Sequence, residues 1–318
     1  MRLQNQQQLW FAALAAALVL ILYAGMATRS AAQPAAGCGA PAPAAGESIR
    51  TIEVDGLART YLLYVPTSYD GAQPVPLVFS LHGFASNPRQ QSGFSQWNAI
   101  AEEETLIAVH PAGMGFPLRW SAYDVPLGPI RTENVDDVAF FAALIDALSE
   151  ELCIDPARIY VNGLSNGGGM SVRLACELAD RIAAIGTVAG AHFPLDACAP
   201  ARPVPVIAFH GTADAIVPYE GNDLLPAVQD WARGWAELNG CDLTPEALPS
   251  IGAASAIRYS GCGGAAEVIL YTIDDGGHTW PGSPVVLPPF LVGPTNQDLD
   301  ATRLMWAFFD AHPLREGA

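Results

Sequence analysis

Residues 161–170 read VNGLSNGGGM, which places Ser165 between Gly163 and Gly167 and makes Gly167 the first of three consecutive glycines. The apolar residues before this stretch predict a strand, and NGGGMSVRLACELA after the serine predicts a helix. A G-x-S-x-G motif between a strand and a helix is typical of a nucleophile elbow, a sharp turn that exposes the serine hydroxyl. The alternative is a glycine-rich turn whose serine only caps the helix. The strand and helix on either side favour the elbow.

The chain around this motif alternates apolar runs with amphipathic stretches. The segments IRTIEV and RTYLLYVP predict two opening strands joined at Asp55-Gly56. Asn134 and Asp137 give a capping signal to the clearest helix. The pattern predicts one α/β domain over residues 47–316, with a mostly parallel central sheet and helices on both faces. The expected buried strands are VPLVFSLHG, LIAVHPAG, RIYVNG, IAAIGTVAG, PVPVIAFHG and EVILYTI. Helices are expected near residues 94–104, 134–152, 166–179, 228–238 and 298–311.

A serine hydroxyl needs a base to act as a nucleophile, and four histidines follow Ser165 in the chain. His278 lies in DDGGHTWPG, just after the last buried strand, at the sheet edge where the serine should emerge. His210 ends a strand in FHGTAD and is expected to hold its own loop together. His312 falls near the end of the final helix. His192 lies in a loop, and nothing specific supports it as the base. We therefore predict that His278 is the base.

The carboxylate that orients this base is predicted to be Asp214. It follows the penultimate core strand in HGTADAIVPY and fits the chain order serine, acid, histidine. A turn aspartate that bonds its own backbone is the alternative interpretation. Asp274 and Asp275 are too close in sequence to the histidine to reach behind its ring. Asp136 and Asp137 precede the serine, and helix capping accounts for them.

Two backbone N–H groups are candidates for an oxyanion hole. The Asn166 N–H begins the helix after the serine, and the Phe84 N–H lies in the loop after VPLVFSLHG, which could also be a simple turn. Aromatic residues suited to line an acyl pocket are Trp120, Tyr123 and Trp280. Trp280 could instead be a buried aromatic residue that braces the histidine loop.

Six stretches of the chain resemble, in the same order, the secreted feruloyl esterases and polyhydroxybutyrate-depolymerase-like esterases of the α/β-hydrolase fold. They lie within residues 59–282 and read RTYLLYVP, LHGFASN, NVDDVAFF, GLSNGGGM, FHGTAD and GGHTWPG. The resemblance implies the triad Ser165, Asp214 and His278, which hydrolyses carboxylic esters through an acyl-enzyme without a metal or an organic cofactor. Many relatives carry Cys and Gln after the His-Gly of the oxyanion loop, where this chain has Phe84 and Ala85. The preferred acyl group therefore stays open.

Feruloyl or other aryl esters of plant polysaccharide are the expected substrates, because no polymer-binding domain follows the last predicted helix. A depolymerase-type hydrolase of hydroxyalkanoate oligomers and an acyltransferase of the same fold are the alternatives. A serine peptidase and a non-catalytic binding module are less favoured. The net charge of −17, with 15 arginines and no lysine, argues against binding to nucleic acid or anionic membranes. The oligomeric state is left open.

The first 32 residues are typical of a signal peptide. Arg2 precedes an apolar run over residues 9–27, and small residues at 30–32 suit cleavage. An uncleaved membrane anchor is the alternative, because the run approaches the length that spans a bilayer. Residues 33–46 are rich in Ala, Pro and Gly and predict a linker. We expect a secreted, extracellular protein without stable membrane association after cleavage, with a periplasmic or membrane-anchored protein as alternatives.

The six cysteines predict three disulfides in an exported protein, since their spacing resembles no zinc motif. Cys241 and Cys262 are expected to pair because both lie on the segment before the last strand. Cys176 ends a helix and Cys198 precedes a strand at the same sheet edge, which favours a second pair. The remaining pair is then Cys38 with Cys153.

Overall fold

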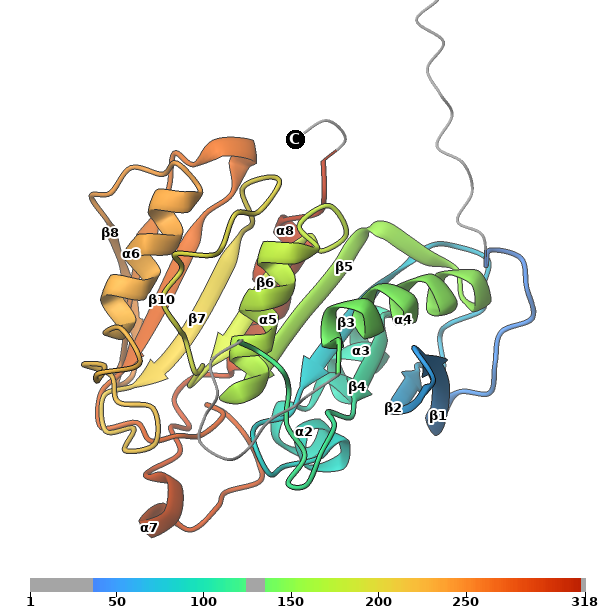
Figure 1. The fold of residues 1–318 in the computed structure, drawn as a ribbon, viewed down its shortest axis with the longest axis horizontal. Coiled ribbons are helices and arrows are strands. Elements are labelled where there is room, and N and C mark those ends of the chain that lie inside the picture. Colours follow the sequence, from blue (N-terminus) through green and yellow to red (C-terminus); the bar gives the residue numbers. More distant parts are fainter. Residues whose placement is uncertain (1–36, 124–134, 316–318) are drawn as a thin grey trace, which may run out of the picture. The chain divides into compact units, whose positions relative to one another are not determined.

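The computed structural model describes residues 37–123 and 135–315. The predicted signal peptide, residues 33–36 of the predicted linker and Asn134 lie outside this part of the chain. The strands are β1 (Gly46–Val54), β2 (Leu57–Val65), β3 (Val75–Leu81), β4 (Ile107–Pro111), β5 (Ile154–Leu164), β6 (Ala184–Val188), β7 (Val206–Gly211), β8 (Glu246–Ile251), β9 (Ala254–Tyr259) and β10 (Val268–Ile273) (Figure 1). The helices are α2 (Pro88–Ser95), α3 (Trp97–Glu104), α4 (Asp137–Glu151), α5 (Asn166–Glu177), α6 (Val228–Leu238), α7 (Pro289–Val292) and α8 (Ala301–Ala311), with a short 3₁₀ turn at Gly263–Ala265.

These strands form one sheet in the order β1-β2-β4-β3-β5-β6-β7-β10-β9-β8. The central strands from β4 to β10 pair in parallel, and antiparallel strands extend the sheet at both ends. Parallel strands direct their carboxyl ends to a common edge of the sheet. The loops after β3, β5, β7 and β10 therefore gather at the edge that is lowest in Figure 1.

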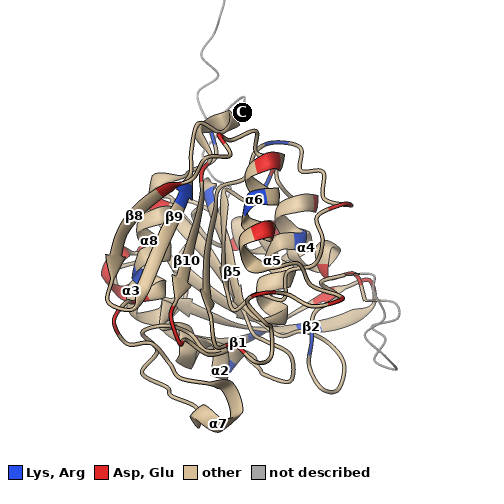
Figure 2. Ribbon diagram, turned by 90° about the vertical axis from the view of Figure 1, so that its left-hand side faces the viewer, with Lys and Arg blue, Asp and Glu red and all other residues tan. Residues whose placement is uncertain are grey.

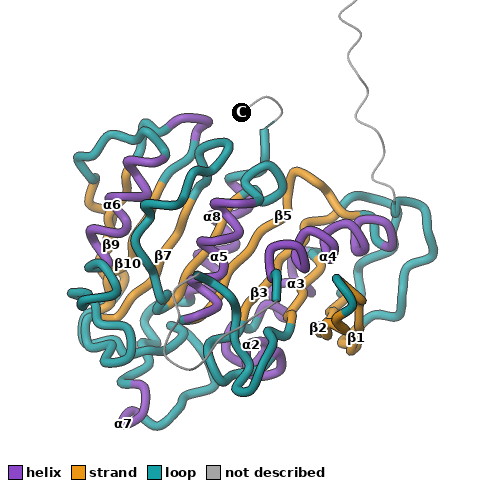
Figure 3. Tube along the Cα trace, viewed as in Figure 1, coloured by secondary structure: helices purple, strands orange, loops and turns teal. Residues whose placement is uncertain are grey.

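Helices cover both faces of the sheet, as Figures 2 and 3 show from two directions. Alternate side chains of β5 enter two different cores, as the period of a strand requires. Val161 packs in the core beneath α4, α5 and α6. Tyr160 packs in the core beneath α3 and α8, where its ring stacks on Phe309 with the centroids 4.8 Å apart. The predicted α/β-hydrolase architecture is confirmed.

Several element boundaries differ from the sequence prediction. The helix expected over residues 94–104 is two helices, because Gln96 adopts a left-handed conformation (φ 56°) between α2 and α3. Asp136 caps α4, and its side chain accepts a hydrogen bond from the Ala139 N–H. The predicted start of the last helix at Asp298 is also wrong, because Asp300 caps α8. The hairpin β8–β9 was not predicted at all.

The three disulfides are Cys38–Cys153, Cys176–Cys198 and Cys241–Cys262, in the pairing that the sequence predicts. Among the described residues, no helix is both long enough and apolar enough to cross a membrane.

Candidate active site

Ser165 lies at a sharp turn between the end of β5 and the start of α5, with φ 56° and ψ −117°. A positive φ is unusual for a residue other than glycine and marks a strained backbone. A Cβ atom at Gly163 would overlap the backbone of Gly167, and one at Gly167 would overlap the backbone of Leu81. Glycine is therefore required at position 163 by the turn itself and at position 167 by its packing against β3. Within the described residues, the serine hydroxyl makes no helix-capping hydrogen bond, contrary to the alternative interpretation.

Asp214 and His278 meet in the loops that follow β7 and β10, two neighbouring parallel strands. The His278 Nδ1 lies 2.7 Å from the Asp214 Oδ2. The other carboxylate oxygen accepts hydrogen bonds from the N–H groups of Ile216 and Val217, both at 2.9 Å. Asp214 is 4% exposed and His278 is 9% exposed, so water competes little for their contact. The carboxylate is thus fixed on three sides and holds the imidazole ring.

The environment of Asp214 favours its charged form. Burial by itself would raise the pKa of this carboxyl group, but hydrogen bonds from His210 and His278 lower it well below its ordinary value. Backbone donation by Val217 acts in the same direction. Asp214 is therefore a carboxylate across the neutral pH range, as a group that stabilises an imidazolium ion must be.

The other candidate histidines occupy structural positions. The His210 Nε2 lies 2.8 Å from the Val217 carbonyl oxygen and 3.4 Å from Asp214, so it holds the acid loop as expected. His192 stacks on Trp231 with ring centroids 3.6 Å apart, and burial keeps its pKa well below the ordinary value. His312 follows α8 and packs on the ring of Phe308. Among the described histidines, only His278 presents Nδ1 to a buried carboxylate that also accepts two backbone N–H groups.

The predicted oxyanion loop lies directly against the serine. A Cβ atom built on Gly83 would contact the Ser165 Cβ at 3.4 Å, so the loop backbone passes beside the elbow. The His82 side chain is fully buried; its Nδ1 lies 2.7 Å from the Gly83 carbonyl oxygen, and its Nε2 accepts the Gly113 N–H at 3.0 Å. Burial lowers the pKa of His82 to about 4, so the ring is neutral near pH 7.

A cavity of about 250 Å³ opens beside Ser165. Trp120 and Tyr123 line it, as predicted, together with four apolar side chains that the sequence did not reveal: Phe193, Ile216, Leu224 and Leu225. Trp280 does not line it, so the prediction of Trp280 as a substrate contact is wrong. That side chain is 2% exposed, and its Nε1 donates a hydrogen bond to Thr302 at the start of α8. Trp280 braces the histidine loop instead.

Several known esterases are similar to this chain. No protein-family model matches the chain. Feruloyl esterase B of Piromyces equi is 33% identical over 69% of the chain, and the chain spans 42% of that protein's length. Feruloyl esterase C of Emericella nidulans is 29% identical, with 80% of this chain and 84% of the relative covered. Feruloyl esterase D of Neurospora crassa is 27% identical, with 92% and 95% covered.

Among solved structures, an acetyl xylan esterase from Aspergillus awamori matches 73% of this chain and 94% of its own, with a TM-score of 0.57 and 14% identity. At that identity the likeness concerns the fold. The fold and the strained serine turn define an α/β-hydrolase. The chain is similar to feruloyl esterases and related esterases of this fold, and its class of activity is carboxylic ester hydrolysis.

Proposed function

We propose that Ser165, His278 and Asp214 form the catalytic triad of this esterase. The observation that carries the proposal is the buried hydrogen bond of 2.7 Å between His278 and Asp214, at the sheet edge where β5 delivers Ser165. In this arrangement the His278 Nδ1 carries a proton toward the carboxylate. Its Nε2 is left as the basic nitrogen that can accept the serine proton.

Hydrolysis then proceeds in two steps. The Ser165 oxygen attacks the ester carbonyl carbon while the His278 Nε2 takes the hydroxyl proton. The tetrahedral intermediate collapses, and the imidazolium ion gives that proton to the departing alcohol. Water enters, loses a proton to the same nitrogen and attacks the acyl-enzyme. The carboxylic acid leaves and Ser165 regains its proton. Asp214 remains ionised throughout and stabilises the imidazolium ion.

The negative charge of each intermediate falls on the former carbonyl oxygen. We assign the N–H groups of Phe84 and Asn166 as its hydrogen-bond donors. Asn166 is the first residue of α5, so the positive end of the helix dipole favours an anion at the same place. Loss of one such donor in serine hydrolases costs roughly 10²–10³-fold in kcat.

Aryl esters attached to plant polysaccharide are the proposed substrates. The cavity beside Ser165 is lined by Trp120, Tyr123 and Phe193 together with aliphatic side chains, which suits a flat aromatic acyl group. Three relatives named as feruloyl esterases support this choice. The three disulfides support export to an oxidising compartment, since such bonds rarely persist in a reducing cytosol.

A side-by-side assay tests the substrate proposal. Purified protein should cleave methyl ferulate with a higher kcat/KM than 3-hydroxybutyrate oligomers, because the apolar cavity favours the aromatic acid. A tenfold preference for the oligomers, equal to ~1.4 kcal/mol of transition-state stabilisation, would overturn it. Addition of a xylo-oligosaccharide to the same reaction measures acyl transfer. Formation of feruloylated sugar in excess of free acid would make the protein an acyltransferase.

A further inference from the structure

One segment of the chain is bonded to both halves of the proposed oxyanion hole. This bridging segment, residues 113–121, makes three hydrogen bonds to the oxyanion loop after β3. The Gly113 N–H donates to His82 Nε2 at 3.0 Å, the Ala85 N–H donates to the Leu118 carbonyl at 2.9 Å, and the Trp120 Nε1 donates to the His82 carbonyl at 2.9 Å. The loop that carries the Phe84 N–H is thus tied to the bridging segment at both of its ends.

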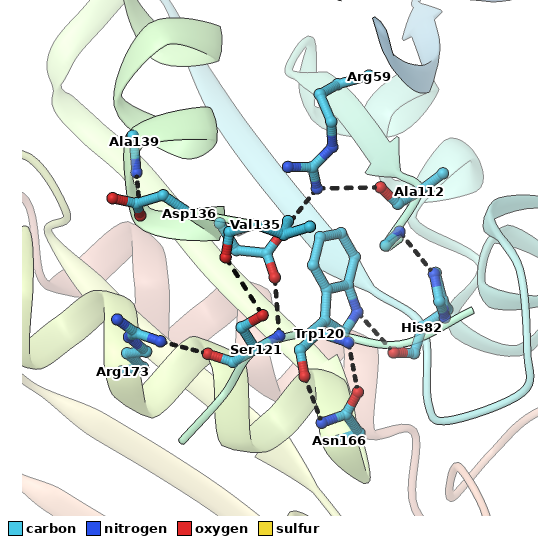
Figure 4. A network of polar contacts seen from close by, with 12 residues as sticks. Arg59, His82, Ala112, Trp120, Ser121, Val135, Asp136, Ala139, Asn166 and Arg173 are labelled. Atoms are coloured by element: carbon cyan, nitrogen blue, oxygen red, sulfur yellow. Dashed lines mark hydrogen bonds and ion pairs between the residues drawn. The ribbon is translucent and has the colours of Figure 1, made fainter. Parts of the chain in front are cut away.

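The same segment is clamped to the serine turn through Asn166. The Asn166 side chain accepts the Trp120 N–H at 2.7 Å and donates to the Trp120 carbonyl at 3.2 Å. Figure 4 shows Trp120 between His82 and Asn166, with its ring nitrogen directed to the first and its backbone to the second. The indole is 3% exposed, so it offers little surface to a substrate. Its backbone N–H, its carbonyl and its ring nitrogen are bonded to Asn166 and His82, which carry or flank the proposed donors.

A buried ion pair holds this arrangement from behind. The Ser121 N–H donates to the Asp137 Oδ2 at 2.7 Å, and the Asp137 Oδ1 lies 2.6 Å from an Arg59 guanidinium nitrogen. The side chains of this pair are 0% and 2% exposed. The Arg59 guanidinium also lies 3.8 Å from the centroid of the Phe140 ring. Trp120 is therefore anchored on one side by α4 and on the other by α5.

We propose that Trp120 is a positioning residue that sets the distance between the Phe84 and Asn166 N–H groups. The inference rests on the proposed catalytic role of Ser165. Oxyanion stabilisation depends on donors held in place before the charge develops, and a displacement of ~1 Å can cost about 100-fold in rate. Trp120 is bonded to the carbonyl of His82, two residues before Phe84, and to the side chain of Asn166. It acts through these two groups and does not touch the reacting atoms itself.

The variant Trp120→Phe tests this role, because it keeps an aromatic ring while it removes the bond to His82 together with part of the ring. Trp235→Phe is the matched control: Trp235 is fully buried, and its Nε1 donates to the Val204 carbonyl at 3.0 Å, just before the amino end of β7 and at the sheet edge opposite the serine. Both variants lose one buried indole hydrogen bond. Kinetics with p-nitrophenyl acetate are measured together with inhibition by phenylboronic acid, which forms a tetrahedral adduct with an active serine.

Trp120→Phe should lower kcat roughly 10- to 100-fold and raise the inhibition constant of phenylboronic acid by a similar factor, with KM within about threefold of the wild type. Trp235→Phe should keep kcat and the inhibition constant of phenylboronic acid within about twofold of the wild type. If Trp120→Phe does not fold, Asn166→Ala, which keeps the backbone N–H and removes the clamp, should give the same pattern.

Two results would overturn the inference: an unchanged kcat in the folded variant, or a loss confined to KM, which would make Trp120 only a wall of the pocket. A wild-type enzyme that is insensitive to phenylboronic acid, or a Ser165→Ala variant that stays active, would instead overturn the proposed function and this inference with it.

Discussion

Two walls of the cavity beside Ser165 differ in how they are held. On the inner wall, Trp120 is buried and bonded to backbone and side-chain groups, and the Tyr123 hydroxyl donates to the Gly169 carbonyl at 3.2 Å. On the outer wall, the apolar side chains of Phe84, Ile216 and Leu224 are 47%, 52% and 56% exposed. The inner wall comes from residues 120–123, at and just after the end of the bridging segment. The outer wall comes from loops at the carboxyl edge of the sheet.

The two walls therefore have different expected roles: the inner wall holds the proposed catalytic groups in position, and the outer wall contacts the bound ester. A wall whose polar atoms are bonded to the serine turn cannot move without moving the proposed catalytic serine. A wall of half-exposed apolar side chains can contribute contact area to a bound ester through side-chain atoms that make no hydrogen bond to the serine turn. We therefore expect substitutions on the inner side to change kcat and stability, and substitutions on the outer side to change KM. The following predictions run from the largest expected effect to the smallest.

Ser165→Ala removes the proposed nucleophile and should lower turnover of p-nitrophenyl acetate by roughly 10⁶-fold, because nucleophile and base act as a unit. The fold should survive, since the hydroxyl makes no helix-capping bond among the described residues. Thermal unfolding of the variant, measured by circular dichroism, checks this point. Substantial activity in a purified, folded variant would remove Ser165 from its role.

Asp214→Asn should lower kcat by roughly 10⁴-fold, because an amide can no longer stabilise the imidazolium ion or select the correct tautomer of His278. Asp274→Asn is the matched control. Asp274 is an exposed carboxylate in the loop that leads to His278 and should leave kcat nearly unchanged. Equal losses in the two variants would show that the loop, and not the buried carboxylate, is what matters.

Much of this site was accessible from sequence because its chemistry lies at strand ends. Buried parallel strands are continuous apolar runs, so the residue that follows each run is placed at the catalytic edge without knowledge of loop structure. That reasoning located Ser165, Asp214 and His278. The hairpin β8–β9 was missed because its strands lie at the end of the sheet, where β8 is largely exposed and carries no apolar run.

The walls of the cavity were harder to predict, because loop conformation has no periodic signal. Trp280 is only two residues from His278, yet its side chain points into the core beneath α8. Ile216 is likewise two residues from Asp214 and does line the cavity. Separation along the chain is the same in the two cases. The direction of the side chain depends on backbone hydrogen bonds that only the structure reveals.

Asp137→Ala should lower the free energy of unfolding by ~3–5 kcal/mol, because it leaves the Arg59 guanidinium buried without its partner. Urea denaturation measures this loss. Glu103→Ala is the control: Glu103 pairs with Arg303 at 2.6 Å on the surface, where solvent screens the interaction, so its unfolding midpoint should hardly move. Similar midpoints for the two variants would contradict the view that the inner wall is anchored by its buried pair.

The stability of the protein should fall between about pH 6.5 and pH 4. Burial lowers the pKa of His82 to about 4 and that of His110 to about 3, so both rings are neutral in the fold. In this range the unfolded chain binds protons that the folded chain excludes. Each histidine then removes up to ~1.4 kcal/mol of stability per pH unit. Below about pH 4, the unfolded chain also binds a proton at Asp214, whose pKa is depressed in the fold. This adds to the loss of stability.

Urea unfolding at pH 7.5, 6 and 5 measures this slope, and His110→Gln should reduce it. His110 is a suitable probe because it lies on β4 and no catalytic role is assigned to it. A free energy of unfolding that stays constant from pH 7.5 to pH 5 would contradict the prediction.

The smallest effect is expected on the outer wall. Leu224→Ala removes an apolar side chain that is 56% exposed in the free protein and that a bound ester would cover only in part. Full burial of a leucine side chain is worth ~1.5–3 kcal/mol, so partial cover should contribute about 0.5–1 kcal/mol. KM for methyl ferulate should therefore rise roughly two- to fivefold with kcat unchanged. KM for p-nitrophenyl acetate, whose acyl group is too small to reach this wall, should stay the same. A fall in kcat for both esters would mean that the outer wall is coupled to the serine turn after all, and the separation between alignment and recognition would fail.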